Sequence, residues 1–420
     1  MLMETCHLCR QPAVQELLDF GPQPVCNRFL AHRWEGEYRH RLAMGVCHSC
    51  GLVQLLDPPP AIQLAPRVGW ITYNEPEGHL DTLADTLARL PGLTSDAVIA
   101  GVTFKDDSTL RRLRDRGFQR TWRIDPGADL GIGQAHLGIE TIQAKLNPAI
   151  ARELVRARGP ADVVVARHIL EHAHDLHGFL AALRTLVRPE GYLVFELPDA
   201  SRALERHDYS TVWEEHLCYF TPVTAQHSLR QAGFSVAHFE VYPYSLENSL
   251  VAIVRPEQYG VPARPPDPVL RSEIDRALQF ARGFSEARAL YQRLLGKHRS
   301  EQGPTAILGA GHLACAFINL LGLRTYFEFV VDDNPHKQGL LMPGSRLPIC
   351  GSAALVRRDI RLCLMTVAPE SEAKVVGNNQ AFLDGGGLVA SIFPESKYAL
   401  PRLMSLSGRS TRVPHASTAA

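Results

Sequence analysis

The sequence has neither an excess of charge of one sign nor a long apolar run. Its 420 residues contain 44 basic and 44 acidic side chains, so the formal net charge is zero. A balanced charge argues against a general nucleic-acid or membrane-surface binder, and no apolar run reaches the ~20 residues of a membrane-spanning helix. The opening residues, MLMETCHLC, lack the basic and apolar regions of a secretory signal. We therefore expect a cytoplasmic protein of two or three domains.

Cysteine is sparse except near the start of the chain. Of nine cysteines, four form two C-x-x-C pairs, Cys6/Cys9 and Cys47/Cys50. An odd total with this spacing is not typical of a disulfide framework. Four thiolates can hold one Zn2+ tetrahedrally, and Gly51 permits a tight turn that aims backbone N–H groups at sulfur. The spacing predicts a structural zinc site without an open catalytic position; redox-active or incidental cysteines are the alternative.

The middle of the chain alternates apolar strands with amphipathic helices. Helical patterns at 108–117 and 177–189 lie among four strand patterns, at 96–102, 121–125, 161–168 and 192–199. Such alternation predicts a parallel sheet covered on both faces. Two further apolar runs, 234–244 and 249–256, are joined by a short segment and predict an antiparallel hairpin at the end of the sheet. This order resembles a class I methyltransferase.

A proline-rich break at 261–269 separates this pattern from a second α/β pattern that begins at 305–311. A long amphipathic helix is expected between them, over 270–295. The expected fold is therefore α/β, with a class I methyltransferase-like sheet between a zinc-binding module and a Rossmann-like domain. The expected divisions are a zinc-binding module (1–70), a methyltransferase-like domain (71–258), a linker with the long helix (259–300), a Rossmann-like domain (301–405) and a disordered tail (406–420).

Several motifs occur in an order that resembles the sugar C-methyltransferase family. They are the two C-x-x-C pairs, ARHILEH (166–172), WEEHLCYF (213–220), LGAGH (308–312) and VVDDNPHKQGLLMPGSRLPI (330–349). The resemblance spans roughly residues 4–400. It implies zinc, S-adenosylmethionine (SAM) and a nucleotide-linked keto-deoxysugar that is methylated on a carbon beside its ketone. Neither nucleic acid nor membrane is expected as a partner, and the sequence does not specify the oligomeric state.

The resemblance locates the catalytic base in the segment 213–216, which reads W-E-E-H where the family has Tyr-x-Glu-His. His216 would be the base, since an imidazole titrates near neutral pH, and Glu215 would orient it or join a proton relay. Trp213 replaces the family tyrosine, and an indole N–H can donate but neither accept nor ionise. Tyr219 or Tyr73 would then supply the phenol. The alternative is a helix start at the surface.

The resemblance also implies a SAM site after the first strand of the sheet. A working site has an acidic residue and a turn of the form E-x-G-x-x-x-G, whose glycines let the backbone approach the cofactor. The segment 101–113 departs from this form. With Asp107 as the anchor, the acidic position becomes Val102 and the glycine positions become Phe104 and Ser108. A shifted alignment that uses Gly101 restores only one glycine.

Other candidate ligand-binding residues lie at strand ends, where open α/β sheets bind ligands. Asp125, after the second strand, would bind the ribose of SAM, and Arg167 and His168 would line the cofactor cleft. The substrate would contact the remaining candidates, which are Glu171 and His172 in the cleft and Asn27 and Arg28 between the cysteine pairs.

The preferred interpretation is a SAM-dependent C-methyltransferase with a divergent SAM loop. One alternative keeps the same base without SAM, as an epimerase or isomerase, and a second is a non-catalytic sugar-nucleotide-binding protein. The LGAGH segment with Asp332 and Asp333 superficially matches a dinucleotide fingerprint, but it lacks the third glycine, so NAD is not expected.

Overall fold

The computed structural model describes residues 4–69, 75–133, 137–257 and 265–407. Two compact units make up the chain. The first unit comprises Met1–Val25, Arg39–Glu205 and Glu214–Ala281, and the second comprises Cys26–Tyr38, Arg206–Trp213 and Arg282–Ala420. The short segment Cys26–Tyr38 thus separates from the cysteine pairs that flank it. The predicted domain divisions stay predictions.

The N-terminal part of the first unit is a four-stranded antiparallel sheet. Three strands come from consecutive segments, β1 (Val14–Pro24), β2 (Arg39–Cys47) and β3 (Val53–Leu55). The fourth, β8 (Cys218–Tyr219), comes from much farther along the chain and pairs with β3. The sheet of the cysteine-rich module is therefore completed by the segment that directly follows the W-E-E-H motif.

A six-stranded sheet forms the centre of the first unit, in the order β5-β4-β6-β7-β10-β9. The first four of these strands are parallel, and β10 is antiparallel to both of its neighbours. The predicted parallel sheet with a terminal hairpin is confirmed. The strands are β4 (Ile99–Gly101), β5 (Thr121–Arg123), β6 (Ala161–Arg167), β7 (Val187–Pro198), β9 (Phe234–Tyr242) and β10 (Ser249–Pro256).

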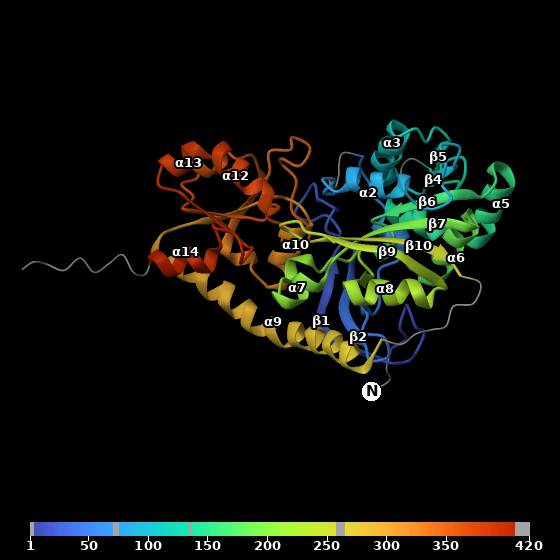
Figure 1. The fold of residues 1–420 in the computed structure, drawn as a ribbon. Helices are drawn as coiled ribbons and strands as arrows, with labels where there is room; N and C mark the ends of the chain where they lie inside the picture. Colours follow the sequence, from blue (N-terminus) through green and yellow to red (C-terminus); the bar gives the residue numbers. More distant parts are fainter. Residues whose placement is uncertain (1–3, 70–74, 134–136, 258–264, 408–420) are drawn as a thin grey trace, which may run out of the picture. The chain divides into compact units, whose positions relative to one another are not determined.

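Helices cover both faces of this sheet (Figure 1). Because side chains alternate along a strand, Val163 and Val165 pack beneath α2 (Leu80–Ala88) and α3 (Asp107–Asp115). The intervening Val164 packs against the opposite layer of helices. That layer contains α4 (Ile139–Lys145), α5 (Pro148–Arg158), α6 (Leu176–Leu186) and α8 (Pro222–Gln231), and the short α1 (Ala61–Leu64) and α7 (Ser201–Glu205) complete the helices of this part.

The second unit contains a five-stranded parallel sheet in the order β13-β12-β11-β14-β15. This is the 3-2-1-4-5 strand order of a doubly wound, Rossmann-like sheet that lacks the sixth strand, as the predicted Rossmann-like domain requires. The strands are β11 (Thr305–Leu308), β12 (Phe327–Val331), β13 (Ile349–Cys350), β14 (Leu362–Met365) and β15 (Leu388–Ser391). The helices are α10 (His312–Leu320), α11 (Ala354–Arg357), α12 (Pro369–Asn378), α13 (Gln380–Asp384) and α14 (Leu400–Ser407).

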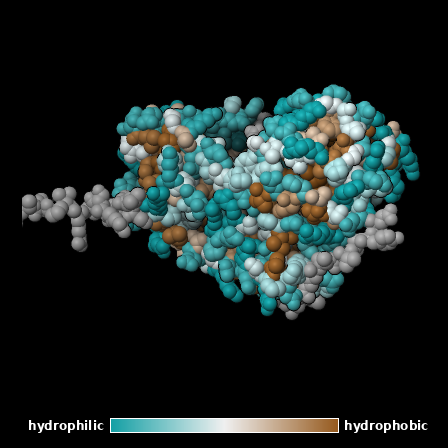
Figure 2. Space-filling model, in the orientation of Figure 1, coloured by the Kyte–Doolittle hydropathy of each residue, from teal (hydrophilic) through white to brown (hydrophobic). Residues whose placement is uncertain are grey.

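The predicted long helix is α9 (Asp267–Glu301), which begins and ends beyond its predicted range. Its residues up to Ala281 belong to the first unit and the rest to the second. On the face shown in Figure 2, hydrophobic residues form separate groups among hydrophilic ones. Within the described residues, no helix combines the length and apolar character that crossing a membrane requires.

Candidate functional site

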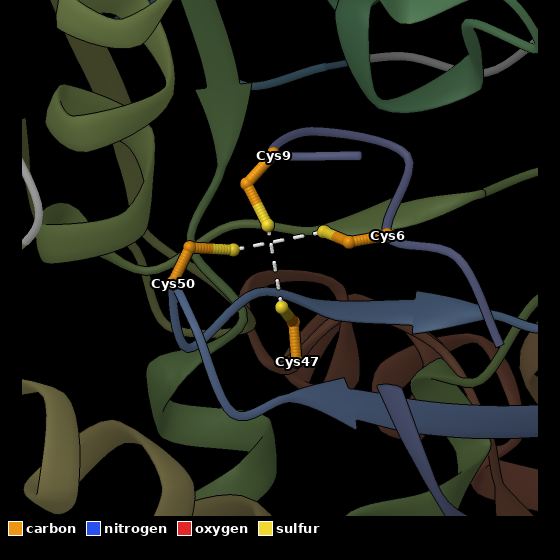
Figure 3. Close-up of side chains that lie close together, drawn as sticks. All are labelled: Cys6, Cys9, Cys47 and Cys50. Atoms are coloured by element: carbon orange, nitrogen blue, oxygen red, sulfur yellow. Dashed lines mark hydrogen bonds between the residues drawn. The ribbon is translucent and has the colours of Figure 1, made fainter. Parts of the chain in front are cut away.

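The four cysteines of the two C-x-x-C pairs converge on one point (Figure 3). The Cys6 and Cys50 sulfurs lie 3.6 Å apart, and those of Cys9 and Cys47 lie 3.5 Å apart. Four Zn–S bonds of about 2.3 Å in a tetrahedron would separate the sulfurs by roughly 3.8 Å, so the cluster fits Zn2+ and offers four protein ligands. Zinc itself stays a prediction.

Local backbone geometry shapes the second cysteine pair. The Ser49 N–H donates to the Cys47 sulfur at 3.4 Å, as the predicted turn requires. Gly51 has φ +80°, and a Cβ there would lie 3.0 Å from the Cβ of Glu273. A side chain at this position would therefore strain the backbone and press on a neighbour.

Gln54 of β3 connects the first cysteine pair to β8, a role that the sequence did not suggest. The residue is 1% exposed, its Oε1 accepts from the His7 N–H at 2.9 Å, and its Nε2 donates to the Thr5 carbonyl at 3.3 Å. Its backbone faces Cys218 in the β3–β8 pair. One residue thus holds the segment around Cys6 and also pairs with the strand after the W-E-E-H motif.

The backbone on the C-terminal side of His216 is held from two directions. The Leu217 N–H donates to the Glu171 carbonyl at 2.8 Å, and the Leu217 carbonyl accepts from the Leu55 N–H at 2.9 Å. Leu55 belongs to β3, and Glu171 lies in the 3-10 turn Leu170–His172 after β6. The cysteine-rich module and the central sheet therefore both position the predicted base.

His216 lies beside a buried group of histidine and glutamate side chains. The His172 and His216 rings meet edge to face with centroids 4.8 Å apart, and His172 Nδ1 lies 3.3 Å from Glu140 Oε1. Two overlapping groups, Glu171/His172/His216 and Glu140/His172/Glu215, each place three ligand atoms within 4.8 Å of one another. Four predicted site residues thus come together, and Glu140 joins them from α4 without any sequence motif.

Crowded carboxyl groups change the protonation of this group. Burial together with the nearby Glu140 and Glu214 carboxylates raises the pKa of Glu215 well above its ordinary value. The raised pKa favours the protonated form of the Glu215 carboxyl, which can donate a hydrogen bond. The Tyr219 ring lies 6.4 Å from that of His216, centroid to centroid. Tyr73, the other candidate phenol, lies outside the described residues.

Backbone N–H groups of the loop after β4 donate hydrogen bonds to a carboxylate of the same loop. Asp106 Oδ2 accepts from the Val102 and Thr103 N–H groups, each at 2.7 Å, and Oδ1 accepts from the Arg167 N–H at 2.9 Å. Burial raises the pKa of Asp106 to about 6, although these N–H donors favour its ionised form. Asp106, the neighbour of the predicted Asp107, is thus the residue that organises the loop.

Arg167 and His168 lie in a buried ionic network at the carboxyl end of β6. Arg167 Nε pairs with Glu196 Oε2 at 2.5 Å, and its Nη1 donates to the Lys105 carbonyl and to Ser108 Oγ. His168 Nε2 lies 3.0 Å from Glu196 Oε1. Although burial disfavours a charged imidazole, the Glu75 and Glu196 carboxylates raise the pKa of His168 to about 10.

The other predicted cofactor residues occupy different surroundings. Asp125 follows β5 and is exposed, and its Oδ1 accepts from the Gly127 and Ala128 N–H groups. Asp107 lies in the first turn of α3 and pairs with Arg123 at 2.8 Å. Gly101 ends β4 with little space for a side chain. Ribose binding by Asp125 stays a prediction, and the loop after β4 does not provide the glycine-rich turn expected for the rest of SAM.

The second unit contains the remaining candidates. Trp213 Nε1 donates to the Cys26 sulfur at 2.8 Å, and its ring stacks on His312 with centroids 4.4 Å apart. The indole N–H of Trp213, which stands where the family has a tyrosine, is therefore engaged by sulfur. Asn27 and Arg28 follow Cys26 in the same unit, and their predicted role in substrate binding stays a prediction.

In the second unit, the Asp332 carboxylate of the apparent dinucleotide fingerprint bonds to the segment that contains the fingerprint's glycines. Asp332 Oδ2 accepts from the Ala310 N–H at 3.0 Å and from Lys337 Nζ at 3.0 Å. Lys337 also donates to the Ala310 carbonyl at 2.6 Å. The acidic residue thus stabilises the loop between β11 and α10.

Three family models match consecutive parts of the chain. A "Putative zinc binding domain" matches residues 6–64, a "Methyltransferase domain" matches 102–238, and a "C-methyltransferase C-terminal domain" matches 271–394.

Single proteins resemble the chain over different extents. C-methyltransferase NovU of Streptomyces niveus is 24% identical over 429 residues, which cover 96% of this chain and 97% of NovU. A solved Burkholderia thailandensis 1,6-didemethyltoxoflavin-N1-methyltransferase with bound S-adenosylhomocysteine is 14% identical, with a TM-score of 0.29 over 43% of this chain and 78% of its own. For a SAM-dependent methyltransferase from Aquifex aeolicus, the identity is 15% and the TM-score 0.28, over 43% and 94%.

Proposed function

We propose that this chain, a methyltransferase whose successive parts match the three family models, methylates a carbon beside the ketone of a nucleotide-linked keto-deoxysugar. The match to the C-methyltransferase C-terminal domain supports carbon as the acceptor. The sugar nucleotide is supported by the order of the motifs, from the cysteine pairs to LGAGH.

The observation that carries the proposal is the buried group around His216. A carbon beside a ketone becomes a nucleophile when a base removes its proton and the electron pair moves onto the carbonyl oxygen. His216 takes that proton in our proposal. Its ring contacts His172, and His172 lies 3.3 Å from Glu140, so a proton can move away from the reacting carbon.

Glu215 has the complementary role. Because burial and its carboxylate neighbours hold its pKa well above the ordinary value, its carboxyl can donate a hydrogen bond to the developing enolate oxygen. This hydrogen bond stabilises the enolate oxygen most strongly as its negative charge develops. Glu215 thereby takes the place of the tyrosine that the 213–216 motif lacks. SAM, when bound, supplies the electrophilic methyl group.

Two readouts in deuterated buffer test the proposal. Zinc-loaded protein is incubated with SAM and a panel of nucleotide-linked keto-deoxysugars, and products are analysed by mass spectrometry for an added methyl group and for deuterium. We expect methylation of at least one sugar. His216→Asn should lose both methylation and exchange at the carbon, while His238→Asn, a histidine of β9 in the same unit, should retain both.

The outcomes separate the three interpretations of the chain. Exchange or epimerisation without methylation would favour a SAM-independent isomerase that uses the same base. Sugar-nucleotide binding without exchange would favour a non-catalytic binding protein. Full activity in His216→Asn would refute the assignment of the base.

A further inference from the structure

The topology of the central sheet defines where a ligand would bind. The chain leaves β4 towards β5 on one side, and β6 lies on the other side of β4. A ligand is therefore expected outside the carboxyl ends of β4 and β6, where the strand order reverses. The residues that follow these ends are Val102 and His168.

At this reversal point, side chains of the protein itself accept hydrogen bonds from the backbone N–H groups that a ligand would otherwise use. The Asp106 carboxylate bridges the two strands, since it accepts from Val102 and Thr103 after β4 and from Arg167 at the end of β6. The Lys105 N–H donates to Thr103 Oγ1 at 3.2 Å. N–H groups that could receive an anionic ligand are thus satisfied within the loop.

The nearby cations are engaged as well. Arg167 is 1% exposed and pairs with Glu196, and Lys105 Nζ lies 2.5 Å from Glu75 Oε1. A carboxylate of a ligand would have to break the buried Arg167–Glu196 pair or the half-buried Lys105–Glu75 pair. Breaking a buried pair is costly because it leaves an uncompensated charge.

The neighbouring strand offers a contrasting environment. Asp125 lies beyond β5, is exposed, and uses Oδ1 to accept from the Gly127 and Ala128 N–H groups. The parallel pairing of Gly101 with Arg123 puts Asp125 at the same edge of the sheet as Val102. A carboxylate at this edge is suited to hydrogen bonds from the two hydroxyls of a ribose.

We infer that the first unit recognises its methyl donor through the adenosine end, at Asp125, and does not bind the amino-acid end. The inference rests on the proposed function, because it concerns the donor of that reaction. SAM carries both an adenosine group and a zwitterionic amino-acid group. Asp106 and the Arg167 and Lys105 ion pairs close the position that would receive the zwitterion.

The test compares two thioethers that differ in the amino-acid group. S-adenosylhomocysteine has it, and 5′-methylthioadenosine lacks it. Hydrogen bonds to a charged ligand group are worth about tenfold or more in affinity. Calorimetric titration of the zinc-loaded full chain should give dissociation constants for the two ligands that agree within about fivefold. A larger preference for S-adenosylhomocysteine would overturn the inference, and absence of binding by both would overturn the proposed function with it.

Two variants localise the recognition. Asp125→Asn keeps the oxygen that caps the local turn but removes the charge, so both ligands should weaken together, by about fivefold or more. Phe104→Ala changes a residue that is 49% exposed in the loop after β4 and should leave the ratio of the two affinities unchanged. Unaltered binding by Asp125→Asn, or a changed ratio in Phe104→Ala, would contradict the inference.

Discussion

Replacing Gln54 by alanine should weaken metal binding by the cysteine-rich module, although Gln54 is not a metal ligand. The substitution removes the acceptor of the His7 N–H and the donor to the Thr5 carbonyl. These two groups flank Cys6, so the segment that presents Cys6 loses its attachment to β3.

The size of the effect follows from these two hydrogen bonds. An intramolecular hydrogen bond contributes about 0.5–1.5 kcal/mol net, and a buried group left without its partner costs about 1–3 kcal/mol. His7 is partly accessible, so water can replace part of the lost hydrogen bonding, and we expect a total loss of stability of the module of about 2 kcal/mol. Because metal binding and folding of such a module are linked, this corresponds to roughly a 30-fold loss of zinc affinity.

Zinc transfer to a chromogenic chelator measures the affinity directly, and amide exchange of the peptide 213–220 measures the effect on the predicted base. We expect faster exchange in that peptide, because Gln54 pairs with Cys218 in the β3–β8 ladder. Gln15→Ala is the matched control, since Gln15 is an exposed glutamine of β1 in the same sheet. Wild-type zinc retention by Gln54→Ala would refute the reasoning.

Three further predictions concern the first unit. Arg167→Met should lower the free energy of unfolding by on the order of 3 kcal/mol, because it leaves Glu196 without its guanidinium partner. In urea unfolding, the double variant Arg167→Met/Glu196→Gln should lose less stability than the sum of the two single variants. An unchanged urea midpoint for Arg167→Met would contradict this. The folded state raises the pKa of His168 to about 10, so protonated His168 stabilises the fold fully below the unfolded pKa near 6.5, and this contribution is lost as the pH rises through 10. The free energy of unfolding should therefore fall between pH 7 and 10, and less steeply in His168→Asn. Parallel curves for the two proteins would exclude His168 as the cause. Glu140→Gln should lower the pKa of Glu215, because Glu140 helps to raise it, and should move the alkaline limb of the pH–rate profile to lower pH; a shift to higher pH would be inconsistent with this pairing.

Periodic patterns predicted the two parallel sheets, because buried strands and amphipathic helices differ in the spacing of apolar residues. The spacing of the two C-x-x-C pairs was enough by itself to predict the cysteine cluster. The hairpin of β9 and β10 followed from two apolar runs with a short connection.

Other features depend on tertiary contacts that leave no periodic trace. A two-residue strand such as β8 has no pattern, and its partner β3 is remote in sequence. The sequence does not distinguish the two adjacent aspartates, Asp106 and Asp107. Only the turn after β4 shows that Asp106 is the one that accepts hydrogen bonds from within the loop. Glu140 lies in an ordinary helix, and its role depends on the approach of His172.

The late pairing of β8 with β3 imposes an order on biosynthesis. A ribosome releases β1, β2 and β3 long before Cys218 and Tyr219 are made, so β3 remains an open sheet edge during that interval. Unpaired edges are templates for association with other chains. Nascent chains that stall between these segments should therefore be prone to aggregate, and a fragment that ends after β3 should keep the exposed edge permanently.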